Sequence, residues 1–435
     1  MRKTKCRSSI WLAAVFLLGL ASCSAAAAEG SLGRFLPVNG NNVYPSHGLL
    51  RAWPANGPRE LWRVSLGLGK SAVAETPGRL FTMFESDGQQ FAVCLEPTTG
   101  RTLWRRLLVP NGNKHVVKGP VCGVLADGDR VYCFPYVSEN GDMWKPRAPC
   151  ICLNAEDGRE IWREALAYNC SEGTTPLIVG DMLYVGGGGR ENILAAVDKR
   201  TGRLVWKVAE DRDAGHTEVY VTGASLIYQE VGGVPQIVVS VFRNDLMGVH
   251  ARDGRVLWHW KLEKATSSGM VPTPVAIGTR LFISASQNAV DYSACLEMMI
   301  RDGGITPKLV YESTQLQCNN YHTPSVHEGA VFGFGRGTNK PALQCTSFDD
   351  GRLLWEEETP DWKRDRQLTV ADGLIFAVTV RDELVLAEAS RTGYRELGRF
   401  DPKIKMGLPQ QPIINNGRLY LRGDEVLACF VVAGQ

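Results

Sequence analysis

Five polar side chains are of types that could bind a cofactor or a metal ion. His216 and Glu218 lie two residues apart, Asn320 and His322 lie in the stretch CNNYHTP, and Arg366 ends the basic stretch KRDR. Amide and carboxylate oxygens are the ligands that Ca²⁺ prefers. An arginine fork can pair with the carboxylates of an organic cofactor. These five residues are the candidate site, although polar side chains also line any water-filled channel.

Other catalytic patterns are missing from the sequence. It contains no H-E-x-x-H, no G-x-S-x-G, no G-x-x-x-x-G-K-[ST] and no C-x-x-C. This excludes the zincin, serine-hydrolase, P-loop and thioredoxin-type sites on motif grounds. The run Gly186–Gly189 is followed by a further predicted strand and not by a helix, so we interpret it as a turn and not as a phosphate-binding loop.

Composition places the chain among folded proteins. The 435 residues are 22% charged and 44% hydrophobic, which excludes a disordered chain. The formal net charge of +2 excludes a strongly basic nucleic-acid platform. We therefore expect no nucleic-acid partner.

The N-terminus has the pattern of an export signal. Four basic residues precede an apolar run from Ile10 to Leu20, which is too short to span a bilayer. Leu20-Ala21-Ser22-Cys23 resembles the bacterial lipobox, in which the cysteine is lipidated, and cleavage within the alanines 25–28 is the alternative. Loss of residues 1–22 changes the charge from +2 to 2 − 4 = −2. We predict a signal peptide at 1–22, an N-terminal tether and lead-in at 23–57 and one domain at 58–435.

A tryptophan repeat runs through that domain. A turn, a glycine, three residues and a tryptophan recur as TTGRTLW, EDGREIW, RTGRLVW, RDGRVLW and DDGRLLW, with NGPRELW as a weaker copy; the tryptophans are Trp62, Trp104, Trp162, Trp206, Trp258 and Trp355. Two degenerate copies place Tyr311 and Leu397 in the tryptophan position. The mean spacing of about 48 residues is typical of one four-stranded propeller blade. We interpret the tryptophans as structural contacts between blades.

The segments between the tryptophans alternate apolar runs with Gly-Asp and Glu-Gly turns and show no helical periodicity. We therefore predict an all-β fold with eight blades, and seven as the fallback. The last segment, 410–432, has no strand of its own that carries a tryptophan. RELWRVS (59–65) from the N-terminal side can supply that strand and leave no open sheet edge.

The unbroken pattern Ala196, Asp198, Thr201, Gly202 and Trp206 resembles the repeat of the PQQ-like β-propeller family, named for pyrroloquinoline quinone. That family includes quinoprotein alcohol dehydrogenases and an outer-membrane barrel-assembly lipoprotein. The resemblance implies eight blades, and it places the loops that carry the five candidate residues around one mouth of a central channel. The adjacent Cys-Cys pair typical of the dehydrogenases is absent.

Cysteines occupy a recurring position in the repeat. Cys94, Cys152 and Cys345 each lie six residues before the turn glycine, where other copies have Ala or Gly, and Cys429 lies near the equivalent position. We interpret this as a position for a small buried side chain. Among Cys122, Cys133 and Cys150, one cross-strand disulfide is possible.

The resulting functional hypothesis is an exported, non-catalytic scaffold that is anchored through Cys23. We expect a monomer on the periplasmic side of a membrane, with the outer membrane favoured because Ser24 and not Asp follows the cysteine. Protein partners in the cell envelope would bind at a propeller face or through loops such as Met143–Pro146, and the lipid anchor would be its membrane contact.

Two alternatives stay open. The first is a PQQ- and Ca²⁺-dependent alcohol or sugar dehydrogenase that uses His216, Glu218, Asn320, His322 and Arg366. The second is a periplasmic binder of a carbohydrate or another small molecule. For the scaffold we expect no cofactor and no catalytic residue.

Overall fold

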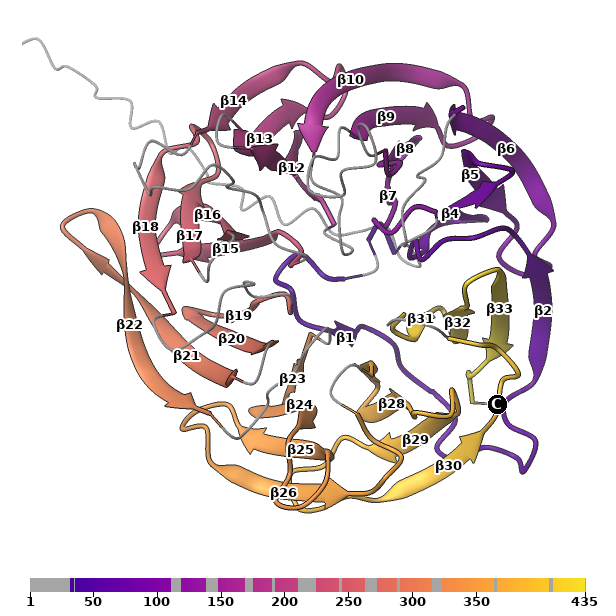
Figure 1. Ribbon diagram of the computed structural model, residues 1–435, viewed down its shortest axis with the longest axis vertical. Helices are drawn as coiled ribbons and strands as arrows, with labels where there is room; N and C mark the ends of the chain where they lie inside the picture. The colour runs from indigo at the N-terminus through magenta and orange to yellow at the C-terminus, as the bar shows by residue number, and fades with distance from the viewer. Residues whose placement is uncertain are drawn as a thin grey trace, which may run out of the picture.

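The computed structural model describes residues 32–34, 36–110, 119–137, 148–168, 175–189, 192–209, 224–241, 245–262, 272–287, 290–314, 323–363, 366–406 and 410–434. These residues form strands and turns, with no helix among them. The strands build a closed ring of eight four-stranded antiparallel blades (Figure 1). This confirms the predicted all-β, eight-bladed propeller. In the described ranges we find no helix of the length and hydropathy needed to cross a membrane.

The first four blades follow the chain, each with its innermost strand first. Blade 1 comprises β3 (Ala74–Thr76), β4 (Arg79–Ser86), β5 (Gln89–Leu95) and β6 (Thr102–Val109). Blade 2 comprises β7 (Leu125–Asp127), β8 (Arg130–Cys133), β9 (Ala148–Asn154) and β10 (Glu160–Tyr168). Blade 3 comprises β11 (Leu177–Val179), β12 (Met182–Gly189), β13 (Asn192–Asp198) and β14 (Leu204–Val208), and blade 4 comprises β15 (Ile227–Val231), β16 (Val234–Val241), β17 (Asp245–His250) and β18 (Val256–Lys261).

Three more blades repeat this order. Blade 5 comprises β19 (Val275–Ile277), β20 (Arg280–Gln287), β21 (Val290–Arg301) and β22 (Gly304–Ser313). Blade 6 comprises β23 (Ser325–His327), β24 (Ala330–Gly335), β25 (Ala342–Ser347) and β26 (Leu353–Glu358). Blade 7 comprises β27 (Leu368–Ala371), β28 (Leu374–Val378), β29 (Leu384–Glu388) and β30 (Glu396–Phe400).

Blade 8 joins the two ends of the propeller. It consists of β31 (Ile413–Asn415), β32 (Arg418–Arg422), β33 (Val426–Val431) and, as its outer strand, β2 (Glu60–Ser65) from the N-terminal side. β2 pairs antiparallel with β33, with Trp62 opposite Cys429. The closing strand is therefore the one that the sequence predicts.

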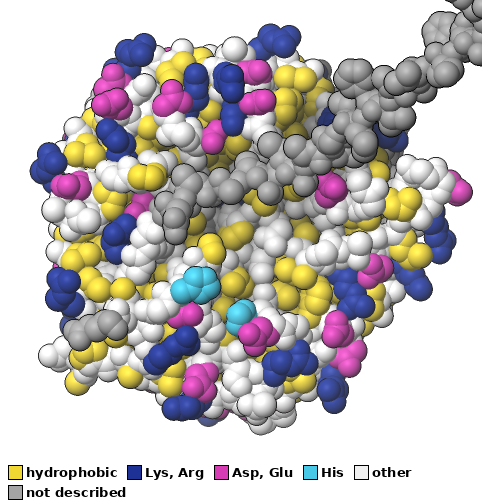
Figure 2. Space-filling view, turned by 180° about the vertical axis from the view of Figure 1, so that it is seen from behind, with side chains coloured by type: hydrophobic (Ala, Val, Ile, Leu, Met, Phe, Trp, Pro, Cys, Tyr) yellow, Lys and Arg dark blue, Asp and Glu magenta, His cyan; other side chains and the backbone are white. Residues whose placement is uncertain are grey.

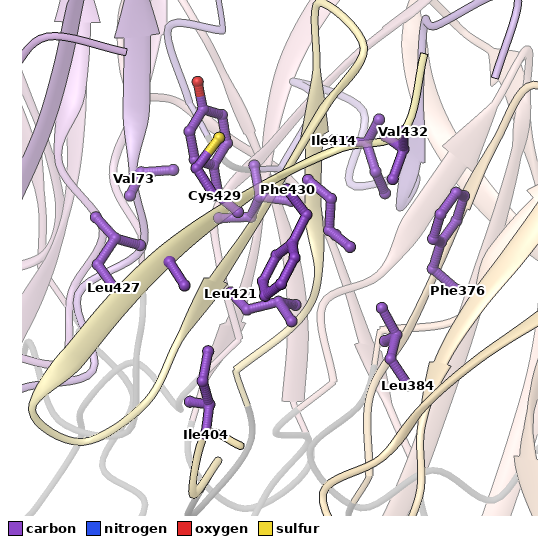
Figure 3. Close-up of a cluster of buried hydrophobic side chains, with 14 of the residues drawn as sticks. Val73, Phe376, Leu384, Ile404, Ile414, Leu421, Leu427, Cys429, Phe430 and Val432 are labelled. Atoms are coloured by element: carbon purple, nitrogen blue, oxygen red, sulfur yellow. The ribbon is translucent and has the colours of Figure 1, made fainter. Parts of the chain in front are cut away.

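A hydrophobic cluster packs blade 8 between its two neighbours. Figure 3 shows Leu427 on the side of Val73 from blade 1, and Phe430 on the side of Phe376 and Leu384 from blade 7. All five side chains are buried. Alternate residues of a strand point to opposite faces, so side chains of β33 pack against blade 1 on one face and against blade 7 on the other.

Within a blade, five of the six repeat tryptophans pack beside an aromatic ring of their own sheet, the exception being Trp258. In blade 2, Tyr132, Cys152 and Trp162 lie opposite one another on three adjacent strands, and the Tyr132 and Trp162 ring centroids are 5.9 Å apart. The rows Phe81–Cys94–Trp104 in blade 1 and Phe332–Cys345–Trp355 in blade 6 have the same form. The two rings meet because the residue between them is small, which explains the recurring cysteine position.

Between blades, five rings lie on the turn glycine of the next blade: Trp62, Trp104, Trp162, Trp206 and Tyr311. The Trp62 indole Nε1 donates to the Pro97 carbonyl oxygen at 2.9 Å, and its ring lies over Gly100, whose φ is 70°. Trp104, Trp162, Tyr311 and Trp355 donate to the equivalent carbonyls of Ala155, Lys199, Phe348 and Ser390. The turn needs a glycine here both for its positive φ and for the close ring.

Blade 4 departs from this pattern. Blade 5 replaces the turn with the long hairpin β21–β22, which extends beyond the ring in Figure 1. The Trp258 indole Nε1 instead donates to the Gln236 side-chain oxygen at 2.7 Å in its own blade. Ile305 and Met298 of the hairpin are buried in one cluster with Trp258, so apolar packing takes the place of the glycine contact.

The glycine contact predicts a position-specific loss of stability in blade 1. An alanine Cβ at Gly100 would lie 2.7 Å from the Trp62 ring, whereas Gly88, with a similar φ of 74°, has no atom within 4 Å of such a Cβ. We expect Gly88→Ala to lower the free energy of unfolding by about 1 kcal/mol and Gly100→Ala by about 2–4 kcal/mol. Urea unfolding followed by tryptophan fluorescence measures both free energies of unfolding. Equal losses in the two variants would contradict the structural role of the contact between the Trp62 ring and Gly100.

Candidate functional site

An N-terminal segment lies at the centre of the ring, and we call residues 32–34 and 36–50 the strap. Leu32 exchanges two backbone hydrogen bonds with Glu75 of blade 1, at 2.7 and 2.8 Å. The short strand β1 (Val43–Tyr44) pairs parallel with β27 of blade 7, close to the centre in Figure 1. Between these points, the strap bonds to the innermost strands, or to the residues leading into them, of blades 2 to 6, at Ala126, Thr175, Leu226, Tyr228, Ala276 and Val326.

Three asparagines attach the strap to successive blades. Asn39 Nδ2 donates to the Ala276 carbonyl of blade 5 at 3.1 Å. Asn41 pairs with both backbone groups of Val326 in blade 6, at 2.9 and 2.8 Å, and Asn42 Nδ2 donates to the Leu368 carbonyl of blade 7 at 2.5 Å. A side-chain amide offers a donor and an acceptor, as a backbone peptide does. The strap therefore occupies hydrogen-bonding groups that face the ring axis.

Glu75 of blade 1 is a buried carboxylate with several hydrogen-bond donors. Its side chain is 2% exposed and accepts hydrogen bonds from Arg418, from the Tyr420 hydroxyl at 2.9 Å, and from the Asn415 and Asn416 amides at 2.9 and 3.4 Å. The four donors belong to blade 8, whereas Glu75 belongs to blade 1 and is bonded to the strap. This network joins the first blade, the last blade and the N-terminal segment.

The structure places one of the five candidate site residues. His216, Glu218, Asn320 and His322 lie outside the described residues, as do Cys23 and the loop Met143–Pro146. Arg366 is described, and it lies at the entry to blade 7.

Arg366 is committed to the protein itself. Its Nη1 contacts the Asp382 carboxylate at 3.0 Å and its Nη2 donates to the Val380 carbonyl at 3.1 Å. Burial raises the pKa of the Asp382 carboxyl above its usual value, and the nearby Arg366 opposes that rise. Arg366 thus holds the β28–β29 connection, and its role toward cofactor carboxylates stays a prediction.

The described residues show neither a cluster of metal ligands nor, on the face in Figure 2, a broad patch of one charge. Within them, no three His, Cys, Asp or Glu side chains are grouped as a metal site. Figure 2 shows one face of the ring, on which Lys, Arg, Asp and Glu side chains are interspersed around the outer part. A mixed surface of this kind gives no broad field of one sign on that face.

All eight described cysteines are buried and none of them forms a disulfide, including Cys122, Cys133 and Cys150. The structure therefore does not form the cross-strand disulfide that the sequence leaves possible in blade 2. Burial raises the pKa of Cys94 and Cys429 to about 12 and that of Cys152 to about 11. Since the thiolate is the reactive form, these thiols are inert in the folded protein.

This predicts a simple alkylation pattern. After treatment of the folded protein with iodoacetamide at pH 8, we expect the eight described cysteines to stay unmodified, and to react fully once urea has unfolded the chain. Peptide mass spectrometry reads each position separately. Modification of Cys152 in the folded state at the rate of a free thiol would show that the blade 2 core opens.

The sequence interpretation of residues 23–57 as a tether and lead-in did not include the strap. A signal was nevertheless present: VNGNN (38–42) combines a turn glycine with three amides and contains no charged residue. Gly40 has a φ of 77°, and a Cβ there would overlap the Pro274 carbonyl oxygen. A free tether has no such requirement, so this pattern indicates close backbone packing.

Comparisons with known proteins agree with this architecture. Residues 145–334 match the family described as "Outer membrane protein assembly factor BamB". No curated protein is detectably similar in sequence.

Solved structures match most of the chain at low identity. BamB from Moraxella catarrhalis is 15% identical, with 86% of this chain and 97% of that chain covered and a TM-score of 0.57. Quinohemoprotein alcohol dehydrogenase from Comamonas testosteroni is 12% identical, with 94% and 82% covered and a TM-score of 0.66. The quinohemoprotein alcohol dehydrogenase ADHIIG from Pseudomonas putida HK5 is 11% identical, with 94% and 81% covered and a TM-score of 0.61. Such identities show a shared fold. Together with the repeat and the ring of eight blades, they show that the chain is an eight-bladed β-propeller, similar in fold to BamB and to these dehydrogenases.

Proposed function

We propose that the chain is an exported, lipid-anchored and non-catalytic scaffold that binds protein partners in the cell envelope. The observation that carries this proposal is the match of residues 145–334 to the family described as an outer membrane protein assembly factor. The strap supports it, because the innermost strands of the propeller are bonded to the chain's own N-terminal segment. The faces and outer edges of the blades then remain for partners.

The anchor places the scaffold on the periplasmic side of a membrane, with the outer membrane favoured. Cys23 precedes the first strap residue, Leu32, by nine positions. An extended chain of that length spans at most about 30 Å, so the propeller would stay close to the bilayer. The variant Cys23→Ser should be lost from the membrane fraction, while its thermal unfolding should match that of the wild type. Retention of the variant in the membrane fraction would contradict lipidation at this residue.

Partner capture tests the scaffold itself. The full precursor with a C-terminal affinity tag is expressed in its own host, the envelope is cross-linked and dissolved in mild detergent, and the captured proteins are compared with those of a tagged, unrelated lipoprotein. We expect one or a few envelope proteins in stoichiometric amounts. Recovery of none, in repeated preparations with verified anchoring, would contradict the scaffold.

The same preparation tests the dehydrogenase. PQQ and Ca²⁺ are added to the purified protein, and quinone absorbance and dye reduction with an alcohol are measured. The scaffold predicts neither signal. Saturable PQQ binding at micromolar concentration with alcohol-dependent dye reduction would replace the scaffold with the enzyme.

A further inference from the structure

Arg34 of the strap is a buried cation without a described counterion. Its side chain lies near the ring axis, and the residue is 8% exposed. Its Nη2 donates to the carbonyl oxygens of Leu226 at 2.7 Å and Thr175 at 3.4 Å, which are neutral acceptors. Its Nε and Nη1 have no hydrogen-bond partner. Three of the five N–H bonds of the guanidinium are therefore unused.

This arrangement is unfavourable for the chain alone. Burial lowers the pKa of the Arg34 guanidinium to about 9, so the group remains charged at neutral pH. Among the described residues, no carboxylate forms an ion pair with it. Buried charges in proteins are normally paired, because an unpaired one forfeits its hydration without compensation. The charge and its free donors call for an anionic acceptor.

The wall beside Arg34 is also rich in donors. The backbone N–H of Thr175 donates to the Ser225 hydroxyl oxygen at 3.2 Å, that of Ser225 to the Thr273 hydroxyl at 2.9 Å, and that of Thr273 to the Thr323 hydroxyl at 3.2 Å. These residues precede the innermost strands of blades 3 to 6 and are buried.

Each of these hydroxyls accepts a hydrogen bond and keeps its own proton available. In the described part of the chain, nothing accepts a hydrogen bond from Ser225, Thr273 or Thr323. Ser225 is the nearest of the three to Arg34 in the hydrogen-bond network, since Arg34 bonds to the carbonyl of the adjacent Leu226. Two independent features, an unpaired guanidinium and a row of unused hydroxyl protons, thus meet at blades 3 and 4.

We propose that the centre of the ring binds a small oxyanion, a carboxylate or a phosphate, with Arg34 and the Ser225 hydroxyl as its ligands. The anion would accept from Nε or Nη1 of Arg34 and neutralise its charge. Arg34 lies next to Gly33, whose carbonyl accepts from Ala126 of blade 2. Binding would therefore fasten the start of the strap to blades 2 to 4. This site is separate from partner binding, and its failure leaves the scaffold proposal intact.

Titration with defined anions tests the site. The mature protein in an anion-poor buffer is titrated with inorganic phosphate or with citrate, and binding heat and thermal unfolding are measured, with NaCl at matched ionic strength as the reference. We expect saturable binding of at least one probe and a rise in Tm of about 3 °C at 100 times its Kd. The probe that binds more tightly distinguishes a phosphate from a carboxylate ligand.

Matched variants locate the binding. Arg34→Gln should weaken binding about 100-fold or more and Ser225→Ala about tenfold, because hydrogen bonds to a charged group are lost. Arg51→Gln, a change at an arginine that directly follows the strap, is 61% exposed and is paired with Asp372, should leave binding unchanged. If Arg34→Gln does not fold, Ser225→Ala and the wild-type titration still decide the matter. No saturable binding by the wild type, or equal affinity in Arg34→Gln, would overturn the proposal.

Discussion

Replacing Glu75 with leucine should lower the free energy of unfolding by about 3–5 kcal/mol, one of the two largest losses that we expect from a single substitution. The side chain is 2% exposed and accepts hydrogen bonds from Arg418, Tyr420 and Asn415 of blade 8. Removing the carboxylate would leave the Arg418 charge, which is about four-fifths buried, without its partner. The loss is large because the desolvation free energy of the buried Arg418 guanidinium is no longer offset once its counterion is removed. Urea unfolding with fluorescence detection measures it.

Two controls separate this network from a general effect of losing a glutamate. Glu156→Leu removes a carboxylate that is 83% exposed and whose ion pair with Arg79 is long, at 4.0 Å. This change should alter the free energy of unfolding by less than about 0.5 kcal/mol. The double variant Glu75→Leu with Arg418→Met should lose less than the sum of the two single variants, since neither charge is then buried alone. Additive losses in the double variant would show that the two side chains do not depend on each other.

The ring of blades can be predicted from the sequence because each repeat contains the residue types that its own turn and ring contacts require. Five of the turn glycines have a positive φ beneath a ring, as Gly100 does beneath Trp62, so glycine and tryptophan recur at a fixed spacing. The small residue six positions before that glycine is also predictable, since two rings meet over it. The closing strand follows from counting, because the last blade lacked one strand and 59–65 was unused.

The centre of the ring is less predictable, since its contacts join residues far apart in the sequence. Arg34 and Leu226 are 192 positions apart, and no repeat relates them. Arg366 illustrates the limit of residue type: an arginine on a loop suggests an anion ligand, and the sequence does not show that Asp382 and two carbonyls engage it. A polar residue on a loop indicates a binding site only when its hydrogen-bond partners are known. Arg34 was not a candidate because it lies in the segment interpreted as a tether and lead-in.

The strap offers the clearest test of whether the N-terminal segment belongs to the fold. Gly40 has a φ of 77°, and an alanine Cβ there would overlap the Pro274 carbonyl oxygen and lie 2.8 Å from Ile227. Since a backbone atom cannot move aside as a side chain does, we expect Gly40→Ala to displace the strap and to lower the free energy of unfolding by about 3 kcal/mol or more. Gly48→Ala is the matched control, with a φ of 67° and no atom within 4 Å, and its expected loss is about 1 kcal/mol.

Displacement and global unfolding give different signatures in this pair. The strap is bonded to all eight blades, but the ring itself closes through β2, which follows the strap in sequence. Gly40→Ala should therefore keep its β-sheet circular dichroism while residues 36–50 become sensitive to protease under conditions in which Gly48→Ala resists cleavage. Hydrogen exchange at Val370, whose N–H donates to the Asn42 carbonyl, should accelerate in the same variant. If Gly40→Ala keeps both protections, the strap tolerates a methyl group against Pro274, and its packing is looser than the hydrogen bonds to eight blades imply.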